Sequence, residues 1–217
     1  MPASGDNPPA RERPRALLVD FGGVLTTNVF AAFREFCERE GLNPETVKRT
    51  FRERPEALAL LRRLEVGELD EDEFARAFGP LIGVRDTAGL VDRLFAGLRP
   101  DEAMIAAVRS ARSQGVRTGL ISNSWGRGRY DRELLPQLFD AIVISGEVGL
   151  HKPQPEIYEL AAERAGVPCS ACVFVDDLRE NCAGAEAVGM TAILHRGADT
   201  TVPELERLFG VPLTSPR

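Results

Sequence analysis

Short apolar runs alternate with helix-patterned segments over most of the 217-residue chain. Such alternation predicts parallel strands joined by crossover helices. We expect strands over residues 16–19, 116–121, 141–144, 172–175 and 191–194. We expect helices between the later strands, over residues 101–114, 131–138, 155–165 and 181–188. The pattern therefore predicts an α/β fold, a Rossmann-like parallel sheet with helices on both faces.

Residues 28–98 interrupt this rhythm, because they show helical patterns and no strand-like alternation. Pro55 favours a helix start, and Asp70 with Glu73 matches a capping box. The segment lies between the first strand and the rest of the sheet, so we read it as an insertion. We expect a core over residues 15–27 and 99–217, and an inserted helical cap over residues 28–98.

The overall charge and hydrophobicity exclude several functions. The formal net charge is −6 and no lysine and arginine cluster forms a long basic face, so we expect no nucleic-acid partner. No apolar run approaches the ~18 residues of a membrane span. Residues 1–14 are rich in proline and charge, lack the apolar centre of a secretion signal, and are expected to be a disordered tail. We expect a cytoplasmic monomer or homodimer without a membrane partner.

A C-x-x-C pair, Cys169 and Cys172, raises the question of zinc or redox chemistry. The chain has only two histidines and no second such pair, so the donors of a zinc site are lacking. Cys172 also opens an apolar run. We expect both thiols to be reduced and structural.

Polar side chains gather where the predicted strands end. Asp20 ends the first strand, Ser122-Asn123 the second, and Asp176-Asp177 the fourth, while Lys152 follows the third by a few residues. Ligands of parallel sheets bind at this edge. Clustered carboxylates repel one another unless a hard cation lies among them, and Mg²⁺ binds carboxylates together with substrate phosphate oxygens. Lysine and serine suit the other phosphate oxygens.

These residues stand in four motifs that resemble those of the haloacid dehalogenase superfamily. The motifs are Asp20-Phe-Gly-Gly-Val-Leu, Ile-Ser122-Asn123-Ser, Lys152-Pro-Gln-Pro-Glu-Ile-Tyr and Phe-Val-Asp176-Asp177-Leu-Arg-Glu-Asn181. The resemblance covers residues 16–195, and the insertion is similar to the family's helical cap. Ser-Asn-Ser-Trp and Val-Asp-Asp resemble the phosphatase-like branch, which includes the N-terminal domain of soluble epoxide hydrolase and some sugar-phosphate phosphatases.

The resemblance implies a role for each motif residue. Asp20 would attack phosphorus and form an aspartyl-phosphate, and Lys152 would neutralise the charge on both groups. Phosphoryl oxygens would be bound by residues of the first two motifs: Ser122, Asn123, Gly22 and Gly23. Mg²⁺ would be bound by Asp20, the Gly22 carbonyl, Asp177 and Asp176. Asn181 would orient these ligands from the following helix. The implied function is a magnesium-dependent phosphatase acting on a small phosphorylated metabolite.

One position departs from the family pattern. Phosphatases of this family usually carry a second aspartate, a general acid, where this chain has Gly22. A positioned acid is worth ~10²–10⁴ in rate. Three explanations remain open: the leaving group departs easily, as an anomeric sugar or acyl oxygen does; another side chain, such as His151 or a cap residue, supplies the proton; or the protein is a weak catalyst.

Two other functions compete with phosphate hydrolysis. Dehalogenase or phosphonatase chemistry also occurs in this superfamily, but a dehalogenase needs an apolar halide cradle, whereas Asp176-Asp177 favours a metal. A regulatory protein without catalysis has no need for clustered charge. Selectivity is expected to come from the cap. Trp125, which belongs to the core, is a candidate pocket residue. The cap's candidate substrate-binding arginines are Arg34, Arg52, Arg54, Arg62 and Arg63.

Overall fold

The core is a parallel five-stranded sheet with the strand order β3-β2-β1-β4-β5. The computed structural model describes residues 13–126, 128 and 130–213. The strands are β1 Ala16–Val19, β2 Arg117–Ser122, β3 Ala141–Ile144, β4 Cys172–Asp176 and β5 Thr191–Leu194. All five expected strands are present, and the predicted fold class is confirmed. Most of the proposed tail, residues 1–12, lies outside the described residues.

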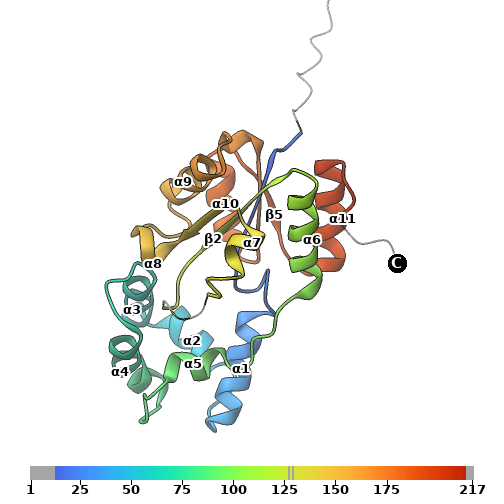
Figure 1. Cartoon of the computed structure of the whole chain (residues 1–217). Coiled ribbons are helices and arrows are strands. Elements are labelled where there is room, and N and C mark those ends of the chain that lie inside the picture. The colour runs from blue at the N-terminus through green and yellow to red at the C-terminus, as the bar shows by residue number, and fades with distance from the viewer. Residues whose placement is uncertain (1–12, 127, 129, 214–217) are drawn as a thin grey trace, which may run out of the picture.

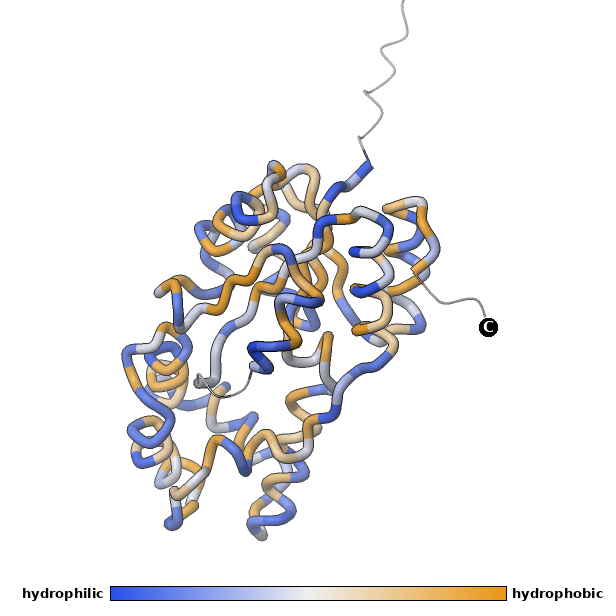
Figure 2. Tube along the Cα trace, viewed as in Figure 1, coloured by the Kyte–Doolittle hydropathy of each residue, from blue (hydrophilic) through white to orange (hydrophobic). Residues whose placement is uncertain are grey.

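Helices cover both faces of the sheet (Figure 1). On one face lie α6 Glu102–Ser113 and α11 Ala198–Phe209, and on the other α9 Pro155–Ala165 and α10 Arg179–Ala187. Figure 2 shows hydrophobic residues along the strands and a mixture of both kinds along the helices. This is the pattern of a buried sheet beneath amphipathic helices.

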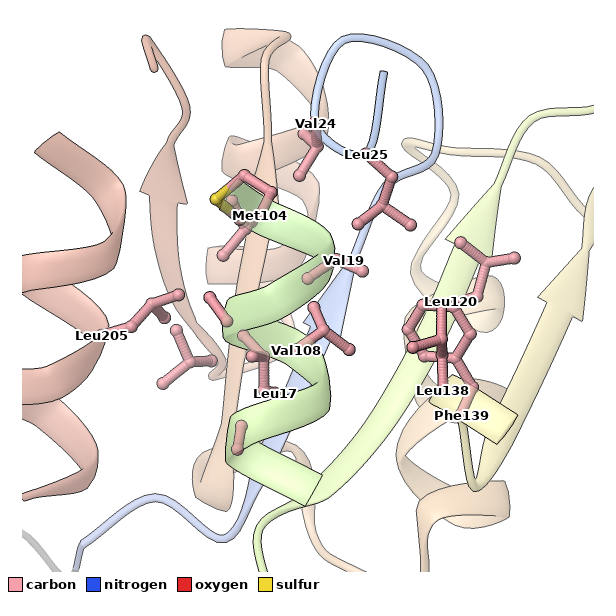
Figure 3. Close-up of a cluster of buried hydrophobic side chains, with 14 of the residues drawn as sticks. Leu17, Val19, Val24, Leu25, Met104, Val108, Leu120, Leu138, Phe139 and Leu205 are labelled. Carbon is pink, nitrogen blue, oxygen red and sulfur yellow. The ribbon is translucent and has the colours of Figure 1, made fainter. Parts of the chain in front are cut away.

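Strand β1 is central and anchors the packing on the first face. Figure 3 shows Leu17 and Val19 of β1 against Met104 and Val108 of α6, with Leu205 of α11 alongside. These side chains are fully buried. Their burial removes apolar surface from water, which is the main favourable contribution to folding.

One expected helix is shorter in the structure, and two further helices were not expected. The helix expected over residues 131–138 shortens to α7 Leu135–Leu138. Pro136 has no N–H to donate to a preceding carbonyl, and Asp131 accepts from the backbone N–H groups of Glu133 and Leu134, so the residues before α7 form a turn. Two elements had not been expected: the short α8 Ser145–Val148, and α11 after the last strand.

Residues 29–95 form a second layer of helices below the sheet in Figure 1. They are α1 Val29–Arg39, α2 Thr46–Glu53, α3 Pro55–Glu65, α4 Glu71–Ile82 and α5 Leu90–Phe95. These helices pack around a hydrophobic cluster of their own, and Asp70 and Glu73 form the expected capping box. We propose that residues 28–98 act as a cap over the core.

The two chain segments that connect the cap to the core, at residues 26–27 and 99–100, lie side by side. Thr26 and Pro100 form an antiparallel bridge, and the Thr27 N–H donates to the Arg99 carbonyl at 2.8 Å.

Among the helices of the described residues, none has the length and apolar character needed to cross a bilayer. All four cysteines are free thiols, and Cys172 is buried in β4.

Candidate active site

Three motifs meet at a buried ion triad. The Lys152 ammonium donates to Asp20 Oδ1 and to Asp176 Oδ2, both at 2.7 Å. The register explains the meeting, because Val19 of β1 lies beside Val175 of β4 and the following aspartates therefore leave the sheet at the same level. Burial alone would lower the pKa of Lys152, but the two carboxylates outweigh it and raise that pKa. Lys152 is therefore a fixed positive charge at the sheet edge.

Asp176 is held from three directions. Besides Lys152, its carboxylate accepts from the Leu178 N–H at 2.8 Å and from the Asn181 side-chain amide at 3.0 Å. Asn181 lies in the first turn of α10, as the motif predicts. The side chain of Asp176 is fully buried. Its bonds keep Lys152 and the start of α10 in register with β1.

Asp177 lies against the backbone of the loop after β1. A Cβ atom at Gly23 would stand 2.5 Å from Asp177 Oδ2, and Gly23 has φ +82, so only glycine fits there. Burial and the neighbouring Asp176 raise the pKa of Asp177 to about 6. The Gly23 N–H, expected to bind phosphate, donates to Thr26 Oγ1 at 3.1 Å in this structure.

The carboxylates of Asp20, Asp176 and Asp177 suit a metal ion. One oxygen from each lies within 4.8 Å of the others. Burial raises the pKa of Asp20, and Asp176 adds to this effect against the attraction of Lys152. Three carboxylates and one lysine leave a negative excess in a buried site, which a divalent cation would neutralise. Hard oxygen donors at this spacing fit Mg²⁺.

Ser122 and Asn123 follow β2 and reach the same edge. Asn123 Oδ1 accepts from the Lys152 N–H at 2.8 Å, and its amide donates to the Lys152 carbonyl at 3.1 Å. Asn123 therefore fixes the backbone that carries the lysine. The Ser122 hydroxyl lies 2.9 Å from the Tyr130 hydroxyl. Tyr130 is buried, and burial raises its pKa to about 12, so it stays a neutral hydrogen-bonding group.

These residues form the polar floor of a cavity of about 420 Å³ between core and cap. Below we call this end the floor. The opposite side, which we call the wall, is apolar and mostly aromatic. Its residues come from the cap helices, from the segment after α5 and, for Trp125 alone, from the core: Val29, Phe30, Phe33, Phe51, Leu58, Leu61, Phe95, Leu98 and Trp125. A polar end and an apolar end in one cavity suit an amphipathic ligand.

Trp125 both lines the cavity and joins the two units. It follows β2 in the core, yet its ring packs against rings of the cap, with centroids 4.9 Å from Phe95 and 5.7 Å from Phe33. Of the arginines considered from the sequence, Arg62 lines the cavity, whereas Arg52 and Arg63 pair with neighbouring glutamates at the surface.

The wall residues other than Trp125 were not identified from the sequence, and neither were two of the cavity residues with polar groups. One is Tyr130, which lies in an irregular loop without a motif. The other is Glu65, the last residue of α3, whose carboxyl shares the cavity with Asp20 and Lys152. Nothing in the sequence distinguishes Glu65 from the other charges of the cap. Only the docking of α3 on the core brings it to the floor.

Comparisons with known proteins identify the family to which the chain belongs. A family model for haloacid dehalogenase-like hydrolases matches residues 14–189. The sesquiterpene phosphatase astK of Aspergillus oryzae is 30% identical over 204 residues, which are 90% of this chain and 97% of that protein. The bifunctional epoxide hydrolase 2 of Sus scrofa is 30% identical over 132 residues, 57% of this chain. This chain spans 24% of that protein and 19% of another relative, the acyl-CoA dehydrogenase family member 10 of Mus musculus.

A solved structure shows the same fold. A HAD family enzyme from Bacteroides thetaiotaomicron, in complex with magnesium and inorganic phosphate, superposes with a TM-score of 0.61 at 19% identity. The match covers 85% of this chain and 95% of that one. The resemblance that the four motifs indicate is thus confirmed for the family and for its phosphatase-like branch. The chain belongs to the haloacid dehalogenase-like hydrolases.

Proposed function

We propose that this hydrolase is a magnesium-dependent phosphatase that works through an aspartyl-phosphate on Asp20. The observation that supports it most is the group of buried Asp20, Lys152 and Asp176 with half-buried Asp177 at the floor of a ligand-sized cavity. Clustered buried charge of this kind is costly to a fold unless it serves binding or catalysis. The phosphatase among the relatives supports the same reaction class.

In the proposed first step, a carboxylate oxygen of Asp20 attacks phosphorus and the bond to the leaving oxygen breaks. Lys152 holds Asp20 in place and reduces the repulsion between the two anions. Ser122 and Asn123 lie beside it to bind phosphoryl oxygens. When bound, Mg²⁺ would supply positive charge between the carboxylates and the phosphate, with Asp20 and Asp177 as the main ligands and Asp176 and the Gly22 carbonyl beside them. Water then attacks phosphorus and frees Asp20.

We further propose that the substrate is a small phosphate monoester whose alcohol is apolar. The wall offers rings and aliphatic side chains, and Arg62 and Glu65 are the cap's charged residues in the cavity. Apolar surface buried there stabilises the complex by about 25 cal/mol per Å². The name of the fungal relative, a sesquiterpene phosphatase, points the same way. We also propose that the protein is a cytoplasmic monomer or homodimer, and its four free thiols suit the cytoplasmic location.

A paired assay tests the proposed reaction. The protein is freed of metal with a chelator, then titrated with Mg²⁺ and given 4-nitrophenyl phosphate or a 2-haloacid in parallel. We expect Mg²⁺-dependent release of phosphate and no release of halide. Halide release without metal would establish the dehalogenase alternative. Tight phosphate binding without turnover of any monoester would establish a regulatory protein.

A further inference from the structure

The leaving alcohol needs a proton, and the loop after β1 does not supply one. Position 22 is glycine, and a Cβ atom built there would stand only 3.0 Å from Val29 Cγ2. The space into which an acidic side chain would grow is thus bordered by an apolar residue of α1. A proton donor for this reaction must come from another part of the cavity.

Glu65 lines the same cavity as the proposed nucleophile. It lies where the wall reaches the floor, and it shares the cavity with Asp20, Lys152 and Asn123. Lys152, Asn123 and Asp20 are all near enough to the Glu65 carboxyl to influence its pKa. Because Asn123 is bonded to the backbone of Lys152, these neighbours of Glu65 are held in place relative to one another.

The core, not only the cap, positions Glu65. The Ser145 hydroxyl of α8 donates to the backbone carbonyl of Glu65, and the same hydroxyl accepts from the Ser124 N–H at 2.7 Å. The end of α3 is therefore tied to the loops after β2 and β3. A side chain at this point has the fixed location that a catalytic group requires.

The charges around Glu65 decide its protonation. Lys152 and Arg62 favour the carboxylate, and Asp20 disfavours it. Burial in the cavity is the largest effect, and it raises the pKa of Glu65 to about 8. His151, Tyr130, Asp177 and Glu180 also line the cavity. Glu65 is thus a neutral acid at pH 7, ready to donate.

We propose that Glu65 is the general acid of this phosphatase and takes the place of the acid that position 22 lacks. The inference rests on the proposed phosphatase function. As Asp20 bonds to phosphorus, the electron pair of the breaking P–O bond passes to the leaving oxygen, which takes the proton of the Glu65 carboxyl. In the second step the Glu65 carboxylate removes a proton from water as that water attacks phosphorus. The P–O bond to Asp20 breaks, phosphate leaves, and Glu65 is protonated again.

Glu65→Gln tests the proposal, with Glu68→Gln as the matched control. Glu68 is an exposed residue that pairs with Arg63 just beyond α3, so its substitution removes a nearby charge outside the cavity. Two substrates of similar size are compared, 2-phenylethyl phosphate and 4-nitrophenyl phosphate. An alkoxide needs protonation and a nitrophenolate does not. The parameter kcat/KM reports only the steps up to loss of the leaving group, so it isolates the acid role.

For Glu65→Gln we expect kcat/KM on the phenylethyl ester to fall ~10²–10⁴-fold, and on the nitrophenyl ester by less than about tenfold. With the nitrophenyl ester we expect kcat to fall while kcat/KM changes little. A burst of nitrophenol then precedes the steady state, because the aspartyl-phosphate waits for a base. The wild-type phenylethyl rate declines above the pKa of Glu65, and the variant lacks this decline. Glu68→Gln behaves as wild type.

Two results separate the failure of this inference from failure of the proposed function. Equal losses on the two esters, or no loss on either, in a folded Glu65→Gln protein would overturn the acid role alone. A wild-type protein that hydrolyses neither ester with Mg²⁺ present would overturn the phosphatase function, and the acid role with it. Partial recovery of the phenylethyl activity in Glu65→Asp supports the proposal. If Glu65→Gln fails to fold, Glu65→Asp decides, since a structural carboxyl would show no dependence on the leaving group.

Discussion

The floor and the wall of the cavity are held together by different forces. On the floor, charged groups bond to one another in fixed directions, as Lys152 does to Asp20 and Asp176. On the wall, rings pack without a directional bond, as those of Phe33 and Trp125 do with their centroids 5.7 Å apart. Hydrogen bonds weaken steeply when misaligned, whereas apolar contact depends mainly on the area covered. The floor is thus built to position reacting atoms, and the wall to accept apolar groups of varied shape.

The two ends also come from different parts of the fold. Strand ends and their loops supply the floor, so its geometry follows from the register of the sheet. Cap helices supply most of the wall, and they depend on how the cap docks. Glu65 crosses this division, because it is a cap residue with an acidic group at the floor. Variants on each side of the division should therefore differ in which kinetic parameter they change.

The largest effect is expected at the floor. Asp20→Asn keeps the shape of the side chain but removes the nucleophile, so we expect kcat on 4-nitrophenyl phosphate to fall by at least ~10³-fold. A loss within about tenfold, or ~1.4 kcal/mol in barrier, would contradict the covalent mechanism.

The same variant should not unfold the protein. The pKa of Asp20 is higher in the folded protein than in the unfolded chain. Above that raised pKa, the ionised carboxylate therefore lowers the free energy of unfolding. This loss disappears as the pH falls to the ordinary pKa range of a carboxyl. Without metal, Asp20→Asn should therefore melt at or above the wild-type temperature at pH 8, with a smaller difference at pH 4. A lower melting temperature at pH 8 would show that the bond to Lys152 outweighs burial.

The second largest effect separates the adjacent aspartates. Asp177→Ala should lose Mg²⁺-dependent activity more completely than Asp176→Ala, by about tenfold or more, because Asp177 is the expected direct ligand. Asp176→Ala should lose more stability, roughly 3–5 kcal/mol, because it leaves the Asn181 amide without its buried acceptor and Lys152 with only one of its two carboxylates. Mg²⁺ titrations of activity and urea unfolding measure the two quantities. Equal metal dependence in both variants would contradict this assignment.

The sequence predicts the floor better than the wall, for a physical reason. Residues that end parallel strands must meet at one edge, so the strand pattern alone is enough to group Asp20, Ser122 and Asp176. Lys152 then bonds to two of the three, Asp20 and Asp176. The docking of α3 and the place of Glu65 depend on long-range contacts such as that of Ser145, which no local pattern encodes. The same holds for Trp125, because its ring contacts belong to the cap.

A moderate effect is expected at the wall. Each added methylene of an alkyl phosphate should raise kcat/KM about fourfold, or ~0.8 kcal/mol, until the cavity is full. Phe30→Ala should weaken this trend, because Phe30 lines the cavity and packs on Phe33. Inhibition by inorganic phosphate, which binds only the floor, serves as the internal control and should stay unchanged. A flat response to chain length would contradict an apolar alcohol.

The smallest effect is expected at Gly22, where floor and wall meet. Gly22→Asp alone should change the rate on alkyl phosphates by less than about threefold, because Val29 borders the space that the new side chain needs and Glu65 already donates the proton. The informative background is Glu65→Gln. There, Gly22→Asp combined with Val29→Ala should recover at least about tenfold of the lost activity on 2-phenylethyl phosphate, since the new carboxyl then has both room and a task. Val29→Ala without the aspartate is the control. If Gly22→Asp raises the rate in the otherwise wild-type protein, protonation was limiting and Glu65 does not donate efficiently. If the combined variant recovers nothing while Mg²⁺ binding is intact, the floor accepts an acid only from the cap side.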